Sequence, residues 1–311
     1  MKTKLFFITV FAILGLSVHA QDANFSQNFS NPLSLNPAYA GSLGCSRFVA
    51  DYSNTFSSIP GNDIIYCASY DQYVDRLHGG LGLIFTSVNE GSGTIIKNDI
   101  NGTYSFNINI NDNFRIRPAI NIGYGHNKLD WNDLFFGNGT TTNTTIPNNK
   151  LNVNYFNAGA GVLFAYKNFI SGIALDHINQ PNIGFLSYSE LFAKLTIHSS
   201  LEIKITDNTN LTPGIIFQQQ HDYGYSFLPS LMLNYRYIKF GVAFRLPNEA
   251  NPDSFIGMLG FVNNRMSIGY SYDITISKLS SASSGVNEIT AVFKFNCKNK
   301  EKYGVTHICG F

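Results

Sequence analysis

Charged residues are scarce in this sequence. Asp, Glu, Lys and Arg make up 13% of its 311 residues, whereas they make up about a quarter of an ordinary globular chain. The net charge is +1, and no cluster of Lys or Arg stands out along the chain. Because nucleic-acid binding needs a basic footprint, we expect no nucleic-acid partner. A soluble chain with so little charge would tend to associate, which favours a protein that is surrounded by lipid.

Long apolar runs are almost missing as well, and the one strong run lies at the N-terminus. Lys2 and Lys4 precede an apolar stretch over residues 5–18, and small residues lead to Ala20. This layout predicts a signal peptide over residues 1–20 that is cleaved on export. A retained anchor is the weaker alternative, because the run is shorter than the ~20 residues of a spanning helix. No later segment reaches 18 consecutive apolar residues.

The four cysteines include no CxxC pair, which argues against a structural zinc site. An exported chain meets an oxidising compartment in which disulfides persist. Proximity in sequence favours a bond between Cys45 and Cys67. It equally favours a bond between Cys297 and Cys309, and free buried thiols are the alternative.

Alternation of apolar and polar residues recurs along the mature chain. Between Ile96 and Ile110 the even positions are mostly apolar and the odd positions mostly polar. A period of two gives a strand one apolar and one polar face. Further alternating segments lie near residues 44–54, 63–71, 79–88, 114–124, 151–166, 168–177, 191–206, 210–219, 225–238, 239–246, 253–262, 265–276 and 286–297. We therefore predict roughly fourteen strands, an even number like that of single-chain outer-membrane barrels.

The predicted fold is all-β: a transmembrane antiparallel outer-membrane β-barrel with both termini in the periplasm. The mean hydropathy of −0.03 fits strands that face lipid on one side and a polar lumen on the other. Short and long connections alternate, as in barrels with short periplasmic turns, although the segment 71–79 looks long for such a turn. A soluble β-sandwich is the alternative, but it would have shorter strands.

The predicted domains follow from this layout. Residues 21–42 form an N-terminal segment in the periplasm or the lumen, residues 43–297 form the barrel, and residues 298–311 form a periplasmic tail. Pro32 and Pro37 remove backbone donors, so the first segment cannot be a central strand.

No catalytic constellation is predicted. Asp176 and His177 are adjacent, and adjacent residues of a strand point to opposite faces, which is poor geometry for a hydrolytic triad. The other histidines of the mature chain lack the spacing of metal ligands. We therefore expect no enzyme activity, no cofactor and no metal site.

A set of ordered motifs resembles one family. The stretch "FSQNFSNPLSLNPAYAG" at residues 25–41 is similar to the N-terminal signature of the PorP/SprF family of type IX secretion system outer-membrane proteins, found in the Bacteroidota. The likeness continues through residues 58–83, 129–137, 172–182, 269–279, 285–290 and 309–311. The resemblance implies a non-enzymatic barrel that works with periplasmic ring lipoproteins of the type IX system. It also implies partners among secreted proteins with a C-terminal sorting domain, some of them gliding adhesins.

Two functions are compatible with these expectations. In the first, the barrel docks a secreted protein through outer loops, chiefly residues 130–150 and 177–190, and meets the secretion machinery through its periplasmic end. In the second, it is a diffusion channel or hydrophobic-substrate transporter, with a pore lined by Arg115, Arg117, Lys194, Glu202 and Lys204.

Tyr39 is the expected anchor of the N-terminal segment, and sealing of the barrel mouth is an equal alternative role for that segment. The candidate partner-binding residues are Asn36, Pro37, Tyr39, Gly41, Trp131, Asp176, His177, Glu288 and Phe311.

Overall fold

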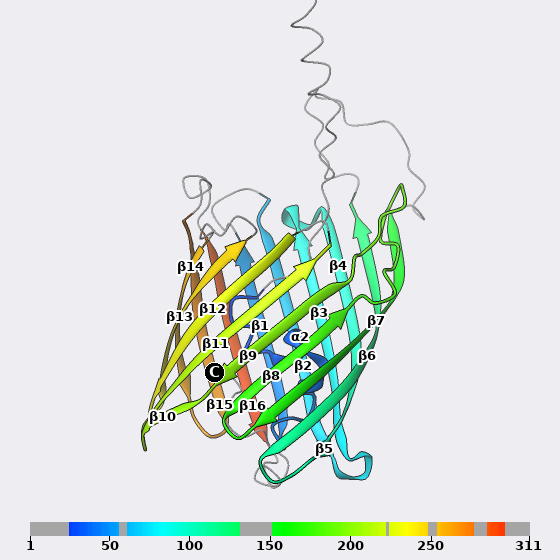
Figure 1. Ribbon diagram of the computed structural model, residues 1–311. Helices are drawn as coiled ribbons and strands as arrows, with labels where there is room; N and C mark the ends of the chain where they lie inside the picture. Colours follow the sequence, from blue (N-terminus) through cyan, green and yellow to red (C-terminus); the bar gives the residue numbers. More distant parts are fainter. Residues whose placement is uncertain are drawn as a thin grey trace, which may run out of the picture.

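The computed structural model describes residues 25–55, 61–130, 151–221, 224–247, 254–276 and 285–295. Within these ranges every strand joins one antiparallel sheet, which closes on itself as a barrel of tilted strands (Figure 1). The all-β prediction is confirmed.

The strands agree with the predicted ranges to within a few residues. They are β1 Ser46–Thr55, β2 Asp63–Val74, β3 Gly79–Glu90, β4 Ile95–Phe106, β5 Ile108–Asn109, β6 Phe114–Leu129, β7 Asn152–Tyr166, β8 Phe169–Asp176, β9 Lys194–Leu201, β10 Ile203–Thr206, β11 Thr209–Gln220, β12 Gly224–Tyr235, β13 Ile238–Pro247, β14 Ser254–Val262, β15 Met266–Thr275 and β16 Val286–Phe295. Both β4 and β5 pair with β6, and both β9 and β10 pair with β11. Each of these couples is one interrupted strand, so the described residues form a barrel of fourteen strands, as predicted.

The first and last strands close the barrel. β1 pairs with β16 over ten consecutive residue pairs, from Ser46 opposite Phe295 to Thr55 opposite Val286. Closure leaves the sheet without an unpaired edge, which is what a strand-built protein needs in lipid, where water cannot satisfy backbone groups.

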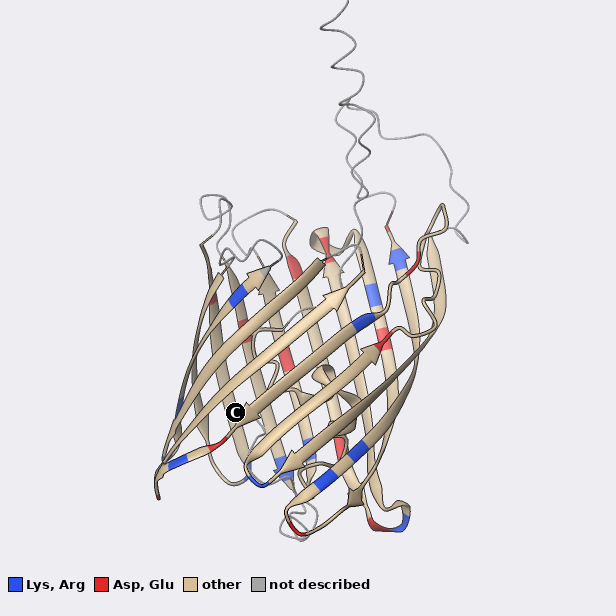
Figure 2. Ribbon diagram, in the orientation of Figure 1, with Lys and Arg blue, Asp and Glu red and all other residues tan. Residues whose placement is uncertain are grey.

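The outward face of the strands is apolar. Side chains such as Leu83, Ile122 and Leu259 are about half exposed, at 50%, 52% and 53%. Figure 2 shows that most of the length of the strands carries no charged residue. Where a charged residue of a described strand does face outward, as Lys128 does, it lies near the end of that strand. A lipid-facing band explains why the sequence has so little charge.

The connections alternate in length between the two ends of the barrel. At one end β2 runs to Val74 and only a short 3₁₀ turn, η2 (Asp75–Leu77), leads to β3. The expectation of a long connection at residues 71–79 is therefore wrong, because Asp71 to Val74 continue the pairing with β3. The opposite end carries η3 (Gly91–Gly93) and the longer segment 177–193. The location of the short turns in the periplasm stays a prediction.

Residues 25–45 lie inside the barrel, and we call them the plug (Figure 1). The plug contains one helical turn, α2 (Pro32–Leu35), and one 3₁₀ turn, η1 (Pro37–Tyr39), each beginning with a proline. Proline suits the first position of a helix, where its missing N–H has no partner to lose. Leu35 and Tyr39 are 1% exposed and pack with lumen side chains such as Leu163. No described helix has the length and apolar character needed to cross a membrane.

Substitution of Leu83 by Arg tests the lipid-facing band. A guanidinium near the middle of the outer face should lower the free energy of unfolding by roughly 2–4 kcal/mol, because lipid solvates charge poorly. The measurement is urea unfolding in phospholipid vesicles, read as heat-modifiable migration on gels. Leu77→Arg, in the exposed turn η2, is the control and should change stability little. Equal stability of both variants would contradict a lipid-facing position for Leu83.

Candidate functional site

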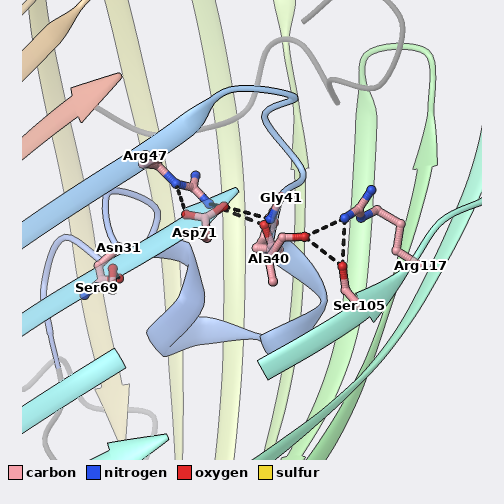
Figure 3. A network of polar contacts seen from close by, with 9 residues as sticks. Asn31, Ala40, Gly41, Arg47, Ser69, Asp71, Ser105 and Arg117 are labelled. Carbon is pink, nitrogen blue, oxygen red and sulfur yellow. Dashed lines mark hydrogen bonds and ion pairs between the residues drawn. The ribbon is translucent and has the colours of Figure 1, made fainter. Parts of the chain in front are cut away.

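An ion pair between β1 and β2 binds one side of the plug. Arg47 Nε donates to Asp71 Oδ1 at 2.8 Å, and both side chains are at most 1% exposed. Asp71 Oδ2 also accepts from the backbone N–H of Gly41 at 2.8 Å, and Arg47 Nη2 donates to the carbonyl of Tyr39 at 3.3 Å. Figure 3 shows how this pair meets the turn that follows η1. The two buried charges thus hold each other and the plug backbone.

The other side of the same turn is held by Arg117 of β6. Its Nε donates to the carbonyl of Ala38 at 3.2 Å, and its Nη2 donates to the carbonyl of Ala40 at 2.5 Å. Ser105 Oγ of β4 donates to the same Ala40 carbonyl at 2.7 Å and accepts from Arg117 Nη2 at 2.7 Å (Figure 3). Arg117 Nη1 reaches Asn107 Oδ1, at the interruption between β4 and β5. Residues 38–41 are therefore clamped between two walls of the barrel.

The start of the plug is held by two carboxylates of β15 and β16. Glu288 accepts from the backbone N–H groups of Ser26 and Gln27 at 2.7 and 2.8 Å. Asp273 Oδ2 accepts from Ser26 Oγ at 2.7 Å and from Arg245 Nη2 at 3.1 Å. Carboxylates buried in this way need such donors, since an uncompensated buried charge is costly.

Asn31 ties the middle of the plug to β1 and β2. Its Nδ2 donates to Asp51 Oδ2 at 2.6 Å, and its Oδ1 accepts from Ser69 Oγ at 3.1 Å. With Asp71, Asp273 and Glu288, Asp51 is the fourth inward carboxylate that accepts a hydrogen bond from the plug. Acceptors on the wall and donors on the plug together fix its position.

The asparagine-proline turn at residues 36–39 reaches β7, β8 and β9. Asn36 Oδ1 caps η1 by accepting from the N–H of Ala38 at 2.9 Å. Asn36 Nδ2 donates to the carbonyls of Val162 and Ile173, each at 3.2 Å. The ring of Tyr39 stacks on His198, with centroids 5.3 Å apart. This turn therefore contacts a third part of the wall.

Glycine is required where the plug meets β3. A Cβ on Gly80 would collide with the carbonyl oxygen of Ala40, which is backbone and cannot swing away. Gly41 has a φ of +64°, and a Cβ there would lie 2.7 Å from the Cα of Gly80. The close approach of two backbones thus explains both glycines.

The prediction of a bond between Cys45 and Cys67 is wrong. Cys67 is a free buried thiol that accepts from Asn31 Nδ2 at 3.2 Å, whereas Cys45 is disulfide-bonded. Cys67 lies opposite Asp51, and the separation of six residues from 45 to 51 corresponds to about 20 Å along a strand. A disulfide needs Cα atoms within about 7 Å, so short sequence separation was a poor guide. Cys297 and Cys309 lie outside the described residues.

A cavity of about 140 Å³ lies between the plug and the end of the barrel that carries the longer connections. Plug residues such as Leu33, and Ile183 from the segment 177–193, line part of it. Asp176 and His177 also line it. Asp176 Oδ1 accepts from Asn121 Nδ2 at 3.4 Å, and His177 Nδ1 lies 2.9 Å from Asn157 Oδ1.

The predicted partner-binding residues fall into three groups. Asn36, Pro37, Tyr39 and Gly41 are buried in the plug, and Glu288 holds its start. Asp176 and His177 border the cavity. Trp131 and Phe311 lie outside the described residues. A role in binding another protein stays a prediction for the whole set.

The residues predicted to line a pore also serve other contacts. Arg117 clamps the plug, and Glu202 Oε1 accepts from Asn210 Nδ2 at 2.6 Å. Lys204 pairs with Asp207 at the exposed end of β10. Lys194 borders the cavity.

Sequence reasoning missed the residues that hold the plug from β1, β2, β13 and β15. They are Arg47, Asp51, Asp71, Arg245 and Asp273. A signal for them was present: each is a charged residue at an inward position of a lipid-exposed strand. Such a residue needs a partner inside the barrel.

A closed barrel with an uncharged outer band and a filled lumen is an outer-membrane β-barrel protein. The family model described as type IX secretion system membrane protein PorP/SprF matches residues 17–293. The chain belongs to this family, as its sequence motifs suggested. This membership and the fold place it in the outer membrane.

Solved structures share the fold at low sequence identity. The Pseudomonas putida toluene transporter TodX has a TM-score of 0.52 and 9% identity, covering 89% of this chain and 98% of its own. The Ralstonia pickettii toluene transporter TbuX has a TM-score of 0.51 and 11% identity, covering 86% and 94%. A search among curated proteins found no significant match.

Substitution of Gly80 by Val tests whether the plug closes the barrel. The new side chain would occupy the position of the Ala40 carbonyl, so the plug must move. We expect the unaltered protein to stay closed in planar lipid bilayers and Gly80→Val to show steps of ion conductance. Gly257→Val is the control, because a Cβ at Gly257 meets no atom within 4 Å. A Gly80→Val barrel as closed as the control would contradict the role of this contact.

Proposed function

We propose that this barrel is a non-enzymatic docking protein of the type IX secretion system. It holds a specific secreted protein at the cell surface through its long-connection end, and it meets the periplasmic secretion machinery through the end with short turns. Family membership supports the link to this system. The observation that supports docking is the plug. A barrel of about fourteen strands encloses a lumen wide enough to conduct unless it is filled. Because the plug fills this lumen, docking fits the structure better than conduction.

The long-connection end offers exposed side chains for a protein partner. In the segment 177–193, Leu186 and Tyr188 are 57% and 69% exposed. Tyr188 donates from its hydroxyl to Glu190 Oε1 at 2.8 Å, and this hydrogen bond raises the pKa of the Tyr188 phenol. Aromatic side chains such as that of Tyr188 are enriched at protein interfaces. Most of the predicted docking segment 130–150 lies outside the described residues.

Transport of a hydrophobic substrate is the second candidate. It is favoured by the likeness of the fold to TodX and TbuX, which are described as toluene transporters. The cavity beside the plug would then be part of a route through the barrel. A steady open conductance of the unaltered protein in planar bilayers would support this candidate over docking.

The docking proposal is tested by affinity purification from the native host. Tagged protein is taken from detergent-solubilised outer membranes, and co-purified proteins are identified by mass spectrometry. We expect one large secreted protein together with ring lipoproteins of the type IX system. The double variant Leu186→Ala with Tyr188→Ala should lose at least roughly tenfold of the secreted protein and keep the lipoproteins, since buried aromatic anchors often contribute 2 kcal/mol or more.

A tagged outer-membrane barrel of another family is the control for carry-over. If an intact, correctly folded barrel brings down neither the secreted protein nor the lipoproteins, docking is wrong. If the double variant retains the secreted protein, the barrel docks it through another surface.

A further inference from the structure

The disulfide of Cys45 leads to the part of the chain that follows the last strand. The sequence has four cysteines. Cys45 is disulfide-bonded and Cys67 is a free thiol, so the partner of Cys45 is either Cys297 or Cys309. Both lie in residues 296–311, which follow the described part of β16 and which we call the C-terminal segment. This segment is therefore joined covalently to the end of the plug.

The register of the strands favours Cys309 over Cys297 as the partner. Ser46 pairs with Phe295, so position 296 would face Cys45 if this pairing continued. Phe295 is 42% exposed on the outer face, whereas Cys45 is 2% exposed on the inner side. In a continued strand Cys297 would point outward like Phe295, on the opposite face of the sheet from Cys45. A disulfide needs Cβ atoms about 4 Å apart, and this arrangement does not supply them.

Cys309 reaches Cys45 without strain. Because Ser46 pairs with Phe295, β16 ends directly beside Cys45. Thirteen residues lie between Phe295 and Cys309, and a stretch of this length spans up to roughly 45 Å when extended. The C-terminal segment is thus long enough to leave β16, turn and return to the same end of the barrel.

A second cavity lies at this end of the barrel, and Cys45 lines it. Its volume is about 230 Å³, and the short turns between β12 and β13 and between β14 and β15 contribute to its wall. Leu43 and Val262 provide apolar surface, while Arg236 and Lys294 bring positive charge. No Asp or Glu of the described residues lines the cavity. The cavity therefore suits a group that is partly apolar and negatively charged.

The last two residues of the chain have this chemistry. With Cys309 bonded to Cys45, only Gly310 and Phe311 remain, and two residues extend by about 7 Å at most. The chain end therefore stays next to the cavity. Phe311 carries an aromatic ring for the apolar wall and the terminal carboxylate, which is ionised near neutral pH. Arg236 matches this carboxylate, because a guanidinium binds carboxylates through charge-assisted hydrogen bonds.

We propose that this cavity binds the protein's own C-terminus, which a disulfide between Cys45 and Cys309 holds in place. When the bond forms, the two thiols lose two protons and two electrons to a thiol–disulfide oxidant of the export compartment. The bond joins the plug to the C-terminal segment and leaves Cys297 as a thiol. Phe311 then fixes the C-terminal segment to the barrel. This inference does not depend on the docking proposal.

The end of another protein chain is the competing occupant, because it also carries a carboxylate. A cavity of about 230 Å³ is below the ~300 Å³ at which sites for drug-sized ligands begin, so it accepts a chain end rather than a folded domain. A chain end that is tied to the cavity wall has a high effective concentration there. The protein's own C-terminus is therefore favoured over the end of a separate chain.

Mapping of the disulfide in the unaltered, full-length protein tests the covalent part of the proposal. Protein from outer membranes is kept in detergent without reductant, its free thiols are alkylated, and it is digested with trypsin. Cleavage after Lys and Arg puts each cysteine in a different peptide: one ends at Arg47, and the others are residues 48–76, 295–298 and 303–311. We expect mass spectrometry to find the peptide that ends at Arg47 linked to residues 303–311. A link to residues 295–298, or a covalent dimer on a non-reducing gel, would overturn the proposal.

Reduction of the native barrel by glutathione tests whether the chain end occupies the cavity. A bound chain end shields the disulfide, so loss of its contacts should speed reduction. Phe311→Ala removes the ring and Arg236→Gln removes the cation, and each should raise the rate roughly tenfold, as expected for the loss of one strong contact. Arg76→Gln is the matched control, because Arg76 is exposed in the short turn η2 and does not line the cavity. Equal rates in the unaltered protein and all three variants would show that the cavity does not hold the chain end.

Discussion

The clamp on the turn at residues 38–41 is the contact on which the rest of this structure depends. On one side Asp71, held by Arg47, accepts the N–H of Gly41, and on the other Arg117 and Ser105 donate to the carbonyl of Ala40. The turn satisfies part of its backbone itself, as where the N–H of Ala40 donates to the carbonyl of Pro37, and the wall supplies partners for the N–H of Gly41 and the carbonyls of Ala38 and Ala40. Because it does, a short segment with two prolines fills a lumen that fourteen strands would otherwise leave open.

The distribution of charged residues also follows from the need to hold the plug inside the barrel. Lipid excludes charge from the outer face, and the plug makes use of charge on the inner face, where each carboxylate meets a donor. Glu288 and Asp273 hold the start of the plug, and Asp51 holds its middle through Asn31. The inward charged residues that form hydrogen bonds to the plug are Arg47, Asp51, Asp71, Arg117, Arg245, Asp273 and Glu288. Their neighbours on β4, β6 and β7 are mostly amides, and there the lumen keeps a cavity.

The sequence predicted the strands well and their partners poorly. Strand positions depend on a period of two, which is local, and all fourteen were found within a few residues. The extent of β2 beyond Asp71 depends on pairing with β3, which the local pattern does not contain. Whether Cys67 can form a disulfide depends on strand register, so its proximity to Cys45 in the sequence led to a wrong prediction. The turn with Tyr39 was recognised as an inserted segment, but its ties to His198 and Arg117 join residues far apart in the chain.

Hydrogen exchange of the plug amides tests the central claim most directly. The N–H groups of Ser26, Gln27 and Gly41 donate to buried carboxylates, so exchange in peptides covering residues 25–45 should be as slow as in the strands that hold them. Exchange followed by mass spectrometry on the native barrel in detergent or vesicles gives this comparison. Slow exchange throughout the segment is the result that a fixed plug predicts. Exchange at the rate of an exposed loop, in a barrel whose strands stay protected, would contradict it.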